Sequence, residues 1–342
     1  MEEVRLKNIF IGDPDGLAEA RKDKFNEFFY KKNKKYEELY NNCNKFIVTG
    51  RKGTGKTLLA KYYEMQMKIE GGTAKYIDKD QVLFRQLQAI GNGDIPQRER
   101  AVFILYAILR EVSGLLIAQE KANKYVVNSQ VNLNWLKDGN TGNPSQHMLM
   151  DMIFNKVRTS VDEWKERTNE ELFECLFPPK IKGRETLKFL LNFSHGRPRD
   201  IVNMLNKIIS KYPEEQAFTN EMFIAVEQEY SRDFCNELRN EMSLYYGSEY
   251  INACFSMLTL IRKRNFWKAE AEKVIAKNTQ LAVIVDLDKA LEILYQYGAI
   301  GNMKVLNKSD YKFYFGYRED GSETLNYAEK FTVHFALRKE LL

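Results

Sequence analysis

The most constraining feature of this sequence is the stretch TGRKGTGKT at residues 49–57, which fits the pattern G-x-x-x-x-G-K-[ST]. It follows the apolar run KFIVT at residues 45–49, which has the length and composition of a buried strand. From Lys56 onward apolar residues recur with helical spacing, until GGT at 71–73 ends the helix. The run AKYID at 74–78 predicts a second strand. Strand, glycine loop, helix and strand together predict the opening of a parallel α/β sheet.

A loop of this kind binds phosphate because its glycines let backbone N–H groups turn inward, at the positive end of the following helix. Lys56 is predicted to contact the β- and γ-phosphates of ATP and to contribute to catalysis. Thr57 is predicted to offer its hydroxyl to Mg²⁺. ATP and Mg²⁺ are therefore the expected cofactors. The predicted phosphate-binding residues of the loop are Gly50, Arg51, Lys52, Gly53, Thr54, Gly55, Lys56, Thr57 and Leu58.

Hydrolysis also needs an acid at the end of a second buried strand, to hold Mg²⁺ or activate water. The best textual match, LAVIVDLD, ends in Asp286 and Asp288, but Asp286 is better interpreted as the N-cap of a helix. Asp78 closes the predicted strand AKYID and is the remaining candidate, although a strand-end turn residue is the simpler interpretation. The segment KYVVNSQVNLNWL at 124–136 contains no acid. The sequence therefore supports nucleotide binding better than turnover.

A second motif that suits a phosphate is FSHGRPRDIVNML at residues 193–205. Pro198 suits the first turn of a helix, and Asp200 complements the positive end of that helix. Arg197 and Arg199 oppose the helix dipole, so they need another role. A forked guanidinium can sense whether a γ-phosphate is present, and both arginines are predicted to bind nucleotide, Arg199 with a catalytic role. The alternative is that they pair with acids on neighbouring helices.

Three domains are predicted: a nucleotide-binding α/β core at 1–147, a helical lid at 148–245 and a winged helix at 246–342. In the core, helices are expected at 17–40 and 98–120, and residues 121–147 are expected to be irregular. The lid is expected to be almost wholly helical, with Thr219 as the N-cap of a helix over 219–243. The winged helix is expected to contain helices at 249–264, 266–277 and 286–297. A β-hairpin of KFYFGYR at 312–318 and KFTVHF at 330–335 is expected to follow them.

These residues together resemble the AAA+/STAND branch of P-loop ATPases, and more narrowly a bacterial P-loop ATPase family often linked to defence against phage. The resemblance is carried by FIGDPDGLAEA, GRKGTGK, RPRD, GYR and TVHFAL, at residues 10–20, 50–56, 197–200, 316–318 and 332–337. It implies that Arg199 is the lid arginine, that Arg197 shares its role, and that Phe10 to Asp13 flank the adenine. The number of residues between the loop and the lid arginine is smaller than in that family by about one βαβ unit, ~30 residues. The parallel sheet is therefore expected to be either complete or truncated by that unit.

The predicted winged helix invites a DNA-binding interpretation, but its third helix carries Asp286, Asp288 and Glu292 against Lys289. A net negative helix is poorly suited to a phosphate-lined groove. Basic residues do occur in the hairpin region, namely Lys304, Lys308, Lys312 and Arg318. Contact with a protein partner or intramolecular regulation is favoured over DNA, and a partner protein or a second copy of the chain is expected to bind through the lid and winged helix.

Composition adds limits. The net charge of +5 is mild, and neither the four cysteines nor the three histidines cluster as metal ligands do. No apolar run approaches the ~18 residues that a membrane span needs, so a cytoplasmic protein without a membrane partner is expected.

Three functions remain open: an ATPase or ATP-gated switch that couples ATP and ADP states to the winged helix, a non-hydrolysing nucleotide-binding module that recruits DNA or a protein, and a DNA-binding regulator with a vestigial loop. The first is favoured, with the second as its alternative.

Overall fold

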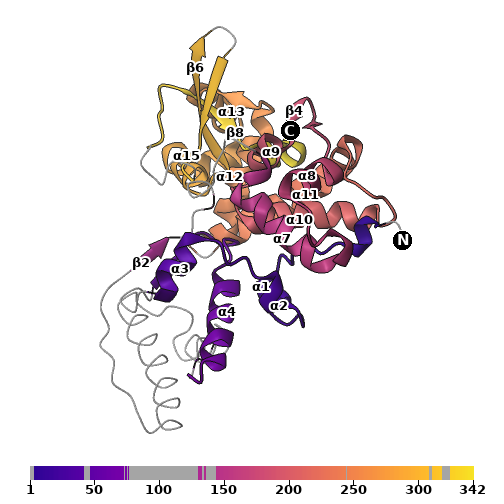
Figure 1. The fold of residues 1–342 in the computed structure, drawn as a ribbon. Coiled ribbons are helices and arrows are strands. Elements are labelled where there is room, and N and C mark those ends of the chain that lie inside the picture. Colours follow the sequence, from indigo (N-terminus) through magenta and orange to yellow (C-terminus); the bar gives the residue numbers. More distant parts are fainter. Residues whose placement is uncertain are drawn as a thin grey trace. The chain divides into compact units, whose positions relative to one another are not determined.

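The computed structural model describes residues 4–41, 47–72, 74, 76, 130–132, 135, 144–243, 245–307, 310–317 and 324–342. The chain divides into two compact units (Figure 1). The first unit comprises Met1–Asp15, Gly50–Gly55 and Leu133–Leu342, and the second comprises Gly16–Thr49 and Lys56–Asn132. Among the helices described, none combines the length and the apolar character needed to cross a membrane.

The second unit contains a pair of parallel strands and a long helix. Strand β1 (Ile47–Thr49) pairs with β2 (Gln130–Asn132), and helix α4 (Lys56–Ile69) begins seven residues after β1 ends. The strand predicted at 45–49 and the helix predicted from Lys56 are both present. The prediction of an irregular segment at 121–147 missed β2, because a three-residue strand of Gln, Val and Asn lacks the apolar run that marks a buried strand.

Three short helices replace the continuous helix predicted for residues 17–40. They are α1 (Gly16–Ala20), α2 (Phe25–Phe28) and α3 (Lys34–Asn41). Asn33 favours the start of a new helix, α3, because its side-chain oxygen accepts a hydrogen bond from the backbone N–H of Lys35 at 2.9 Å. Most of the strand predicted at 74–78, with Asp78, and the helix predicted at 98–120 lie outside the described residues.

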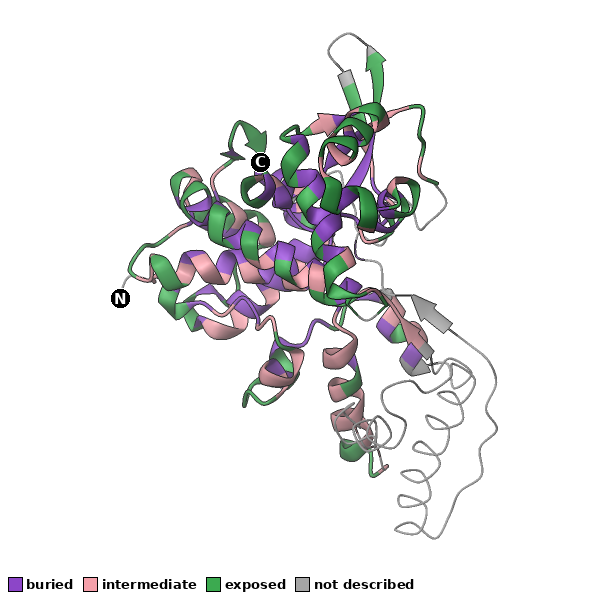
Figure 2. Cartoon of the chain, turned by 180° about the vertical axis from the view of Figure 1, so that it is seen from behind, coloured by how far each residue is buried: buried purple, intermediate pink, exposed green. Residues whose placement is uncertain are grey.

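Helices between residues 148 and 242 supply a large part of the core of the first unit, and their inner faces are buried (Figure 2). These helices are α7 (Met148–Ser160), α8 (Asn169–Leu176), α9 (Thr186–Asn192), α10 (Pro198–Lys211) and α11 (Asn220–Met242). A tight turn of β3 (Lys180–Ile181) and β4 (Arg184–Glu185) precedes α9. Thr219 caps α11 as predicted and accepts the N–H of Met222 at 3.4 Å. The helical pattern predicted for this region is confirmed.

The C-terminal part of the first unit combines helices with one antiparallel sheet of strand order β5-β8-β6-β7. The helices are α12 (Ser248–Ile261), α13 (Lys268–Lys277), α14 (Thr279–Ile284), α15 (Leu287–Gln296) and α16 (Arg338–Leu341). The strands are β5 (Asn265–Phe266), β6 (Ile300–Asn307), β7 (Asp310–Tyr314) and β8 (Lys330–Val333). Asp286 caps α15 as predicted, accepting the N–H of Lys289 at 3.2 Å.

The predicted hairpin of 312–318 with 330–335 is wrong in its pairing. β7 pairs with β6, and β8 pairs with the other edge of β6. The sequence pattern hides β6 because Asn302 occupies a buried position in it. That side chain is satisfied by the backbone of Asn326, to which it donates at 2.8 Å and from which it accepts at 2.9 Å. A buried polar residue therefore breaks the apolar alternation by which a strand is recognised.

The N-terminal segment packs along the helices of the first unit. The backbone N–H of Leu6 donates to the backbone carbonyl of Glu215 at 2.7 Å, and that of Phe10 donates to the Ser160 hydroxyl at 2.9 Å. Beside this contact lies Lys156 of α7, whose ammonium is 5.6 Å from the centre of the Phe10 ring. Lys156 is only 3% exposed, so a residue that is normally charged lies in the interior.

We expect the stability of the protein to respond to pH through Lys156. Burial lowers the pKa of Lys156 to about 7, and the nearby Asp13 carboxylate offsets only part of this effect. Between pH 7 and the ordinary lysine pKa near 10.5 the unfolded chain binds more protons, so the free energy of unfolding rises with pH by up to ~1.4 kcal/mol per unit. Lys156→Met should therefore be more stable than the native chain at pH 6, by a margin that shrinks above pH 7.

Urea unfolding of the native chain and of Lys156→Met at pH 6, 7, 8 and 9 measures this margin, with the exposed Lys165→Met as the control. A margin that stays constant across this range would contradict the assignment.

Candidate phosphate-binding site

The loop from Gly50 to Gly55 has the backbone conformation that its glycines allow. Gly53 and Gly55 have φ values of 85° and 91°, in the left-handed region that side chains disfavour. Helix α4 begins at the next residue, Lys56, and runs for 14 residues. Lys56, Thr57 and Leu58 thus form the first turn of that helix. A turn of this kind that leads into a helix N-terminus is what a phosphate-binding loop requires.

Side chains within the first unit hold the loop from inside. The Thr54 hydroxyl donates to the carbonyl of Arg51 at 2.9 Å, which closes a tight turn. The indole N–H of Trp135 donates to the carbonyl of Thr54 at 3.0 Å, and both side chains are buried. Sequence reasoning did not single out Trp135. The available signal was a large aromatic residue in an otherwise polar segment.

The motif at residues 195–200 lies directly against the loop. The backbone N–H of Arg199 donates to the carbonyl of Gly53 at 3.4 Å. A Cβ atom on Gly53 would lie 3.0 Å from Cβ of Arg199, which is tighter than nine in ten real contacts of that kind. The φ of 85° therefore favours glycine here, and a larger residue would also require Arg199 to shift by a few tenths of an ångström. The structure brings together two of the motifs that the sequence singled out.

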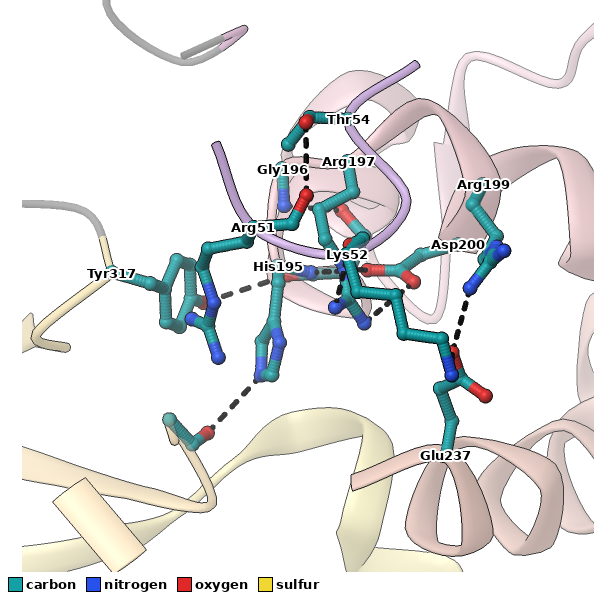
Figure 3. Close-up of polar contacts among 12 residues, drawn as sticks. Arg51, Lys52, Thr54, His195, Gly196, Arg197, Arg199, Asp200, Glu237 and Tyr317 are labelled. Atoms are coloured by element: carbon teal, nitrogen blue, oxygen red, sulfur yellow. Dashed lines mark hydrogen bonds and ion pairs between the residues drawn. The ribbon is translucent and has the colours of Figure 1, made fainter. Parts of the chain in front are cut away.

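Arg197 is the centre of this contact (Figure 3). It is 1% exposed, and its guanidinium donates twice to Asp200 at 2.9 Å and once to Glu241 at 2.6 Å. A further N–H donates to the carbonyl of Lys52 at 2.9 Å. Burial lowers the pKa of Arg197, but Asp200 and Glu241 more than offset this and raise it above its usual value. Arg197 therefore makes the ion pairs that were the alternative to phosphate binding, and it anchors the loop.

Arg199 lies at a more open position. Its guanidinium donates to Glu237 at 2.7 Å and to the carbonyl of Pro14 at 3.0 Å, and Lys52 donates to the same Glu237 at 2.8 Å. These side chains line a cavity of about 340 Å³. Burial alone raises the pKa of Glu237, but the hydrogen bond from Lys52 and the charges of Lys52 and Arg199 bring it below its usual value. Two predicted phosphate-binding cations thus share one carboxylate.

Arg51 extends from the loop toward the C-terminal sheet. It donates to the carbonyl of Tyr297 at 2.7 Å, and its guanidinium lies 5.5 Å from the centre of the Tyr317 ring. Nearby, His195 donates its backbone N–H to Asp200 at 2.8 Å, and its Nε2 lies 3.2 Å from the carbonyl of Gly298. Burial and the charges of Arg51 and Arg197 hold the pKa of His195 well below its usual value, so the ring is neutral at pH 7.

The structure places the remaining predicted residues as follows. Asp78, the acid candidate, and Arg318 lie outside the described residues. β2, the parallel neighbour of the strand before the loop, ends at Asn132, an amide rather than a carboxylate. Sequence reasoning missed the acids Glu237 and Glu241 because they lie 38 and 44 residues from the arginines that they bind. Their only signal was two carboxylates four apart on α11.

Residues 147–239 match the family described as the FunZ-associated C-terminal helical domain. The matched range begins at the N-cap of α7 and ends within α11, so it contains the motif at 197–200 and Glu237. No curated protein and no solved structure matches the chain.

Proposed function

We propose that this chain is an ATP-binding P-loop protein that acts as a nucleotide-gated switch. The observation that carries the proposal is the loop of residues 50–55, whose glycines at positive φ lead directly into a helix that begins with Lys56. In this proposal Lys56 and the loop N–H groups hold the β- and γ-phosphates, and Thr57 holds Mg²⁺. The fold that goes with it is a P-loop α/β core with a helical lid and a C-terminal winged helix.

The arrangement around Glu237 supports the switch. Arg199 and Lys52 both bind Glu237, at 2.7 and 2.8 Å. A γ-phosphate carries more charge than a carboxylate and competes with it for the same two cations. Transfer of Arg199 from Glu237 to phosphate would move the start of α10 relative to α11, and Arg51 would pass the change to the C-terminal sheet. Arg197 keeps the loop in register throughout.

Binding without rapid hydrolysis is favoured because the sequence segment at 124–136, which includes β2, contains no acid that could hold Mg²⁺ or activate water. ATP hydrolysis with Asp78 as the acid is the second candidate function, since that residue closes the segment predicted as a strand.

The output surface is proposed to be a protein partner or a second copy of the chain. The acids of α15 support this choice over DNA: Asp288 pairs with Lys268 at 2.5 Å, and Glu292 accepts from Tyr327 at 3.3 Å. A cytoplasmic location and a role in defence against phage belong to the same proposal. The match of the helical region to the FunZ-associated domain supports the interpretation of that region as a module in its own right.

Lys56→Ala should weaken Mg²⁺–ATP binding by about 10- to 150-fold, because a charged hydrogen bond to phosphate contributes ~1.5–3 kcal/mol. Lys68→Ala, an exposed lysine on the same helix, is the matched control and should bind as the native chain does. Calorimetric titration measures both, with phosphate release followed in parallel. Native-like binding by Lys56→Ala would sink the proposal. Phosphate release that Asp78→Asn abolishes would replace the switch with an ATPase.

A further inference from the structure

A second group of charges in the first unit gathers around a cavity of about 560 Å³. We call it the basic pocket, and six of the residues that line it are cationic: Lys182, Arg184, Arg262, Arg264, Arg338 and Lys339. Glu227 is the acid among the lining residues described, and Lys182 binds it at 2.7 and 3.0 Å. Six cationic side chains against one carboxylate side chain leave an excess of positive side-chain charge around a single concave surface. None of these residues belongs to the loop or to the motif at 195–200.

Two of the cations stand where the backbone would ordinarily select glycine or asparagine. Lys182 has φ 49° in the two-residue turn between β3 and β4, and Arg262 has φ 54° at the C-cap of α12. Within the described part of the chain they are the non-glycine residues with positive φ. A left-handed conformation costs such residues roughly 1–2 kcal/mol. Both of these strained positions line the basic pocket, and strain of this kind collects at binding sites.

The wall of the pocket is held in place around Phe335. The guanidinium groups of Arg338 and Arg184 lie 4.2 and 5.0 Å from the centre of that ring. Arg338 also donates to the carbonyl of Val333 and to the hydroxyl of Thr332, each at 3.0 Å. Burial, followed by the charges of Arg264 and Arg184, lowers the pKa of Arg338 to about 10. Like charges are thus kept close together, and a bound anion would reduce the repulsion between them.

We propose that the basic pocket binds a small molecule that carries two or more phosphate groups. Arginine forks match phosphate oxygens in pairs, and four of the six cations are arginines. The cavity volume falls within the ~300–1,000 Å³ of small-molecule sites. The charges converge on one hollow, whereas contact with a nucleic acid backbone needs a stripe of charge along a surface. This binding is separate from the function proposed for the loop.

Inorganic tripolyphosphate is the probe, titrated by calorimetry into Lys56→Ala so that the contribution of the loop is reduced. The double variant Arg184→Gln/Arg264→Gln in that background should bind it at least ~10-fold more weakly, because two forked contacts are lost. Lys273→Gln/Lys277→Gln removes the same charge from exposed positions on α13 and should change the affinity less than twofold. Equal affinity in the two double variants, or no binding by the parent, overturns the proposal.

Arg262→Gly tests the pocket with a variant whose loss of binding cannot be explained by loss of folding. Glycine is the preferred residue at this left-handed C-cap, so the melting temperature should rise by roughly 2 °C or more while tripolyphosphate binding weakens. A rise in stability with unchanged binding would contradict a role for Arg262 in the pocket. A short RNA or DNA duplex that displaces the probe at far lower concentration would assign the pocket to nucleic acid instead.

Discussion

Arg197→Met should lower the free energy of unfolding by about 3–5 kcal/mol, the cost of breaking a buried ion pair from one side. The substitution leaves the carboxylates of Asp200 and Glu241 without their nearest cation, and these residues are only 4% and 8% exposed. Methionine fills much of the volume of the arginine side chain. The loss of stability should therefore come mainly from the missing charge and less from a cavity. It also removes the donor to the carbonyl of Lys52, which loosens the loop.

Arg199→Met is the matched control for this prediction. Arg199 also makes an ion pair, with Glu237, but both side chains are about a quarter exposed, and such pairs contribute at most ~1 kcal/mol. Chemical denaturation of the two variants and the native chain gives the comparison. If Arg197→Met and Arg199→Met lose similar stability, Arg197 is not the anchor described above. The effects on nucleotide affinity should differ from those on stability. Arg199→Met should remain folded and still lose nucleotide affinity.

Gly301→Ala should destabilise the C-terminal sheet by about 3 kcal/mol, at the upper end of what overpacking costs. Gly301 lies in β6 between two paired strands, and a methyl group there would overlap the carbonyl oxygen of Tyr314. It would also lie 2.7 Å from a ring carbon of Phe315, which is fully buried. Relief requires β7 to move away from β6, because the obstacle is backbone and not a flexible side chain.

Gly247→Ala is the control for that prediction, since no atom lies within 4 Å of the added methyl group and φ is −64°. It should cost about 0.5–1 kcal/mol, because alanine is a poorer N-cap than glycine. Thermal unfolding of both variants tests the contrast. A Gly301→Ala chain as stable as Gly247→Ala would mean that β6 and β7 do not pair as described.

Local patterns account for the parts of the fold that the sequence predicted well. The strand before the loop, the helix from Lys56, the cap at Thr219 and the cap at Asp286 each depend on residues within a few positions of one another. Periodicity and capping are local signals, so they survive without knowledge of the tertiary fold.

The parts that the sequence did not predict depend on distant partners. β6 is a strand because Asn302 finds the backbone of Asn326, and without that partner a buried asparagine argues against a strand. Arg197 is an anchor because Glu241 lies beside it, 44 residues later. A single sequence gives no means of pairing such positions. For this reason the two motifs of the candidate site can be recognised in the sequence, while the roles of its arginines stay open.

The hydrogen bond of Arg51 joins two parts of the chain that are synthesised at very different times. Its partner carbonyl, on Tyr297, is 246 residues further along the chain. At ribosomal rates of ~5–20 residues per second, about 12–50 s separate the synthesis of the two. Arg197, which donates to the carbonyl of Lys52, is synthesised 145 residues after Lys52. Throughout that interval the glycine loop lacks these two contacts, so its native geometry is completed late in the synthesis of the chain.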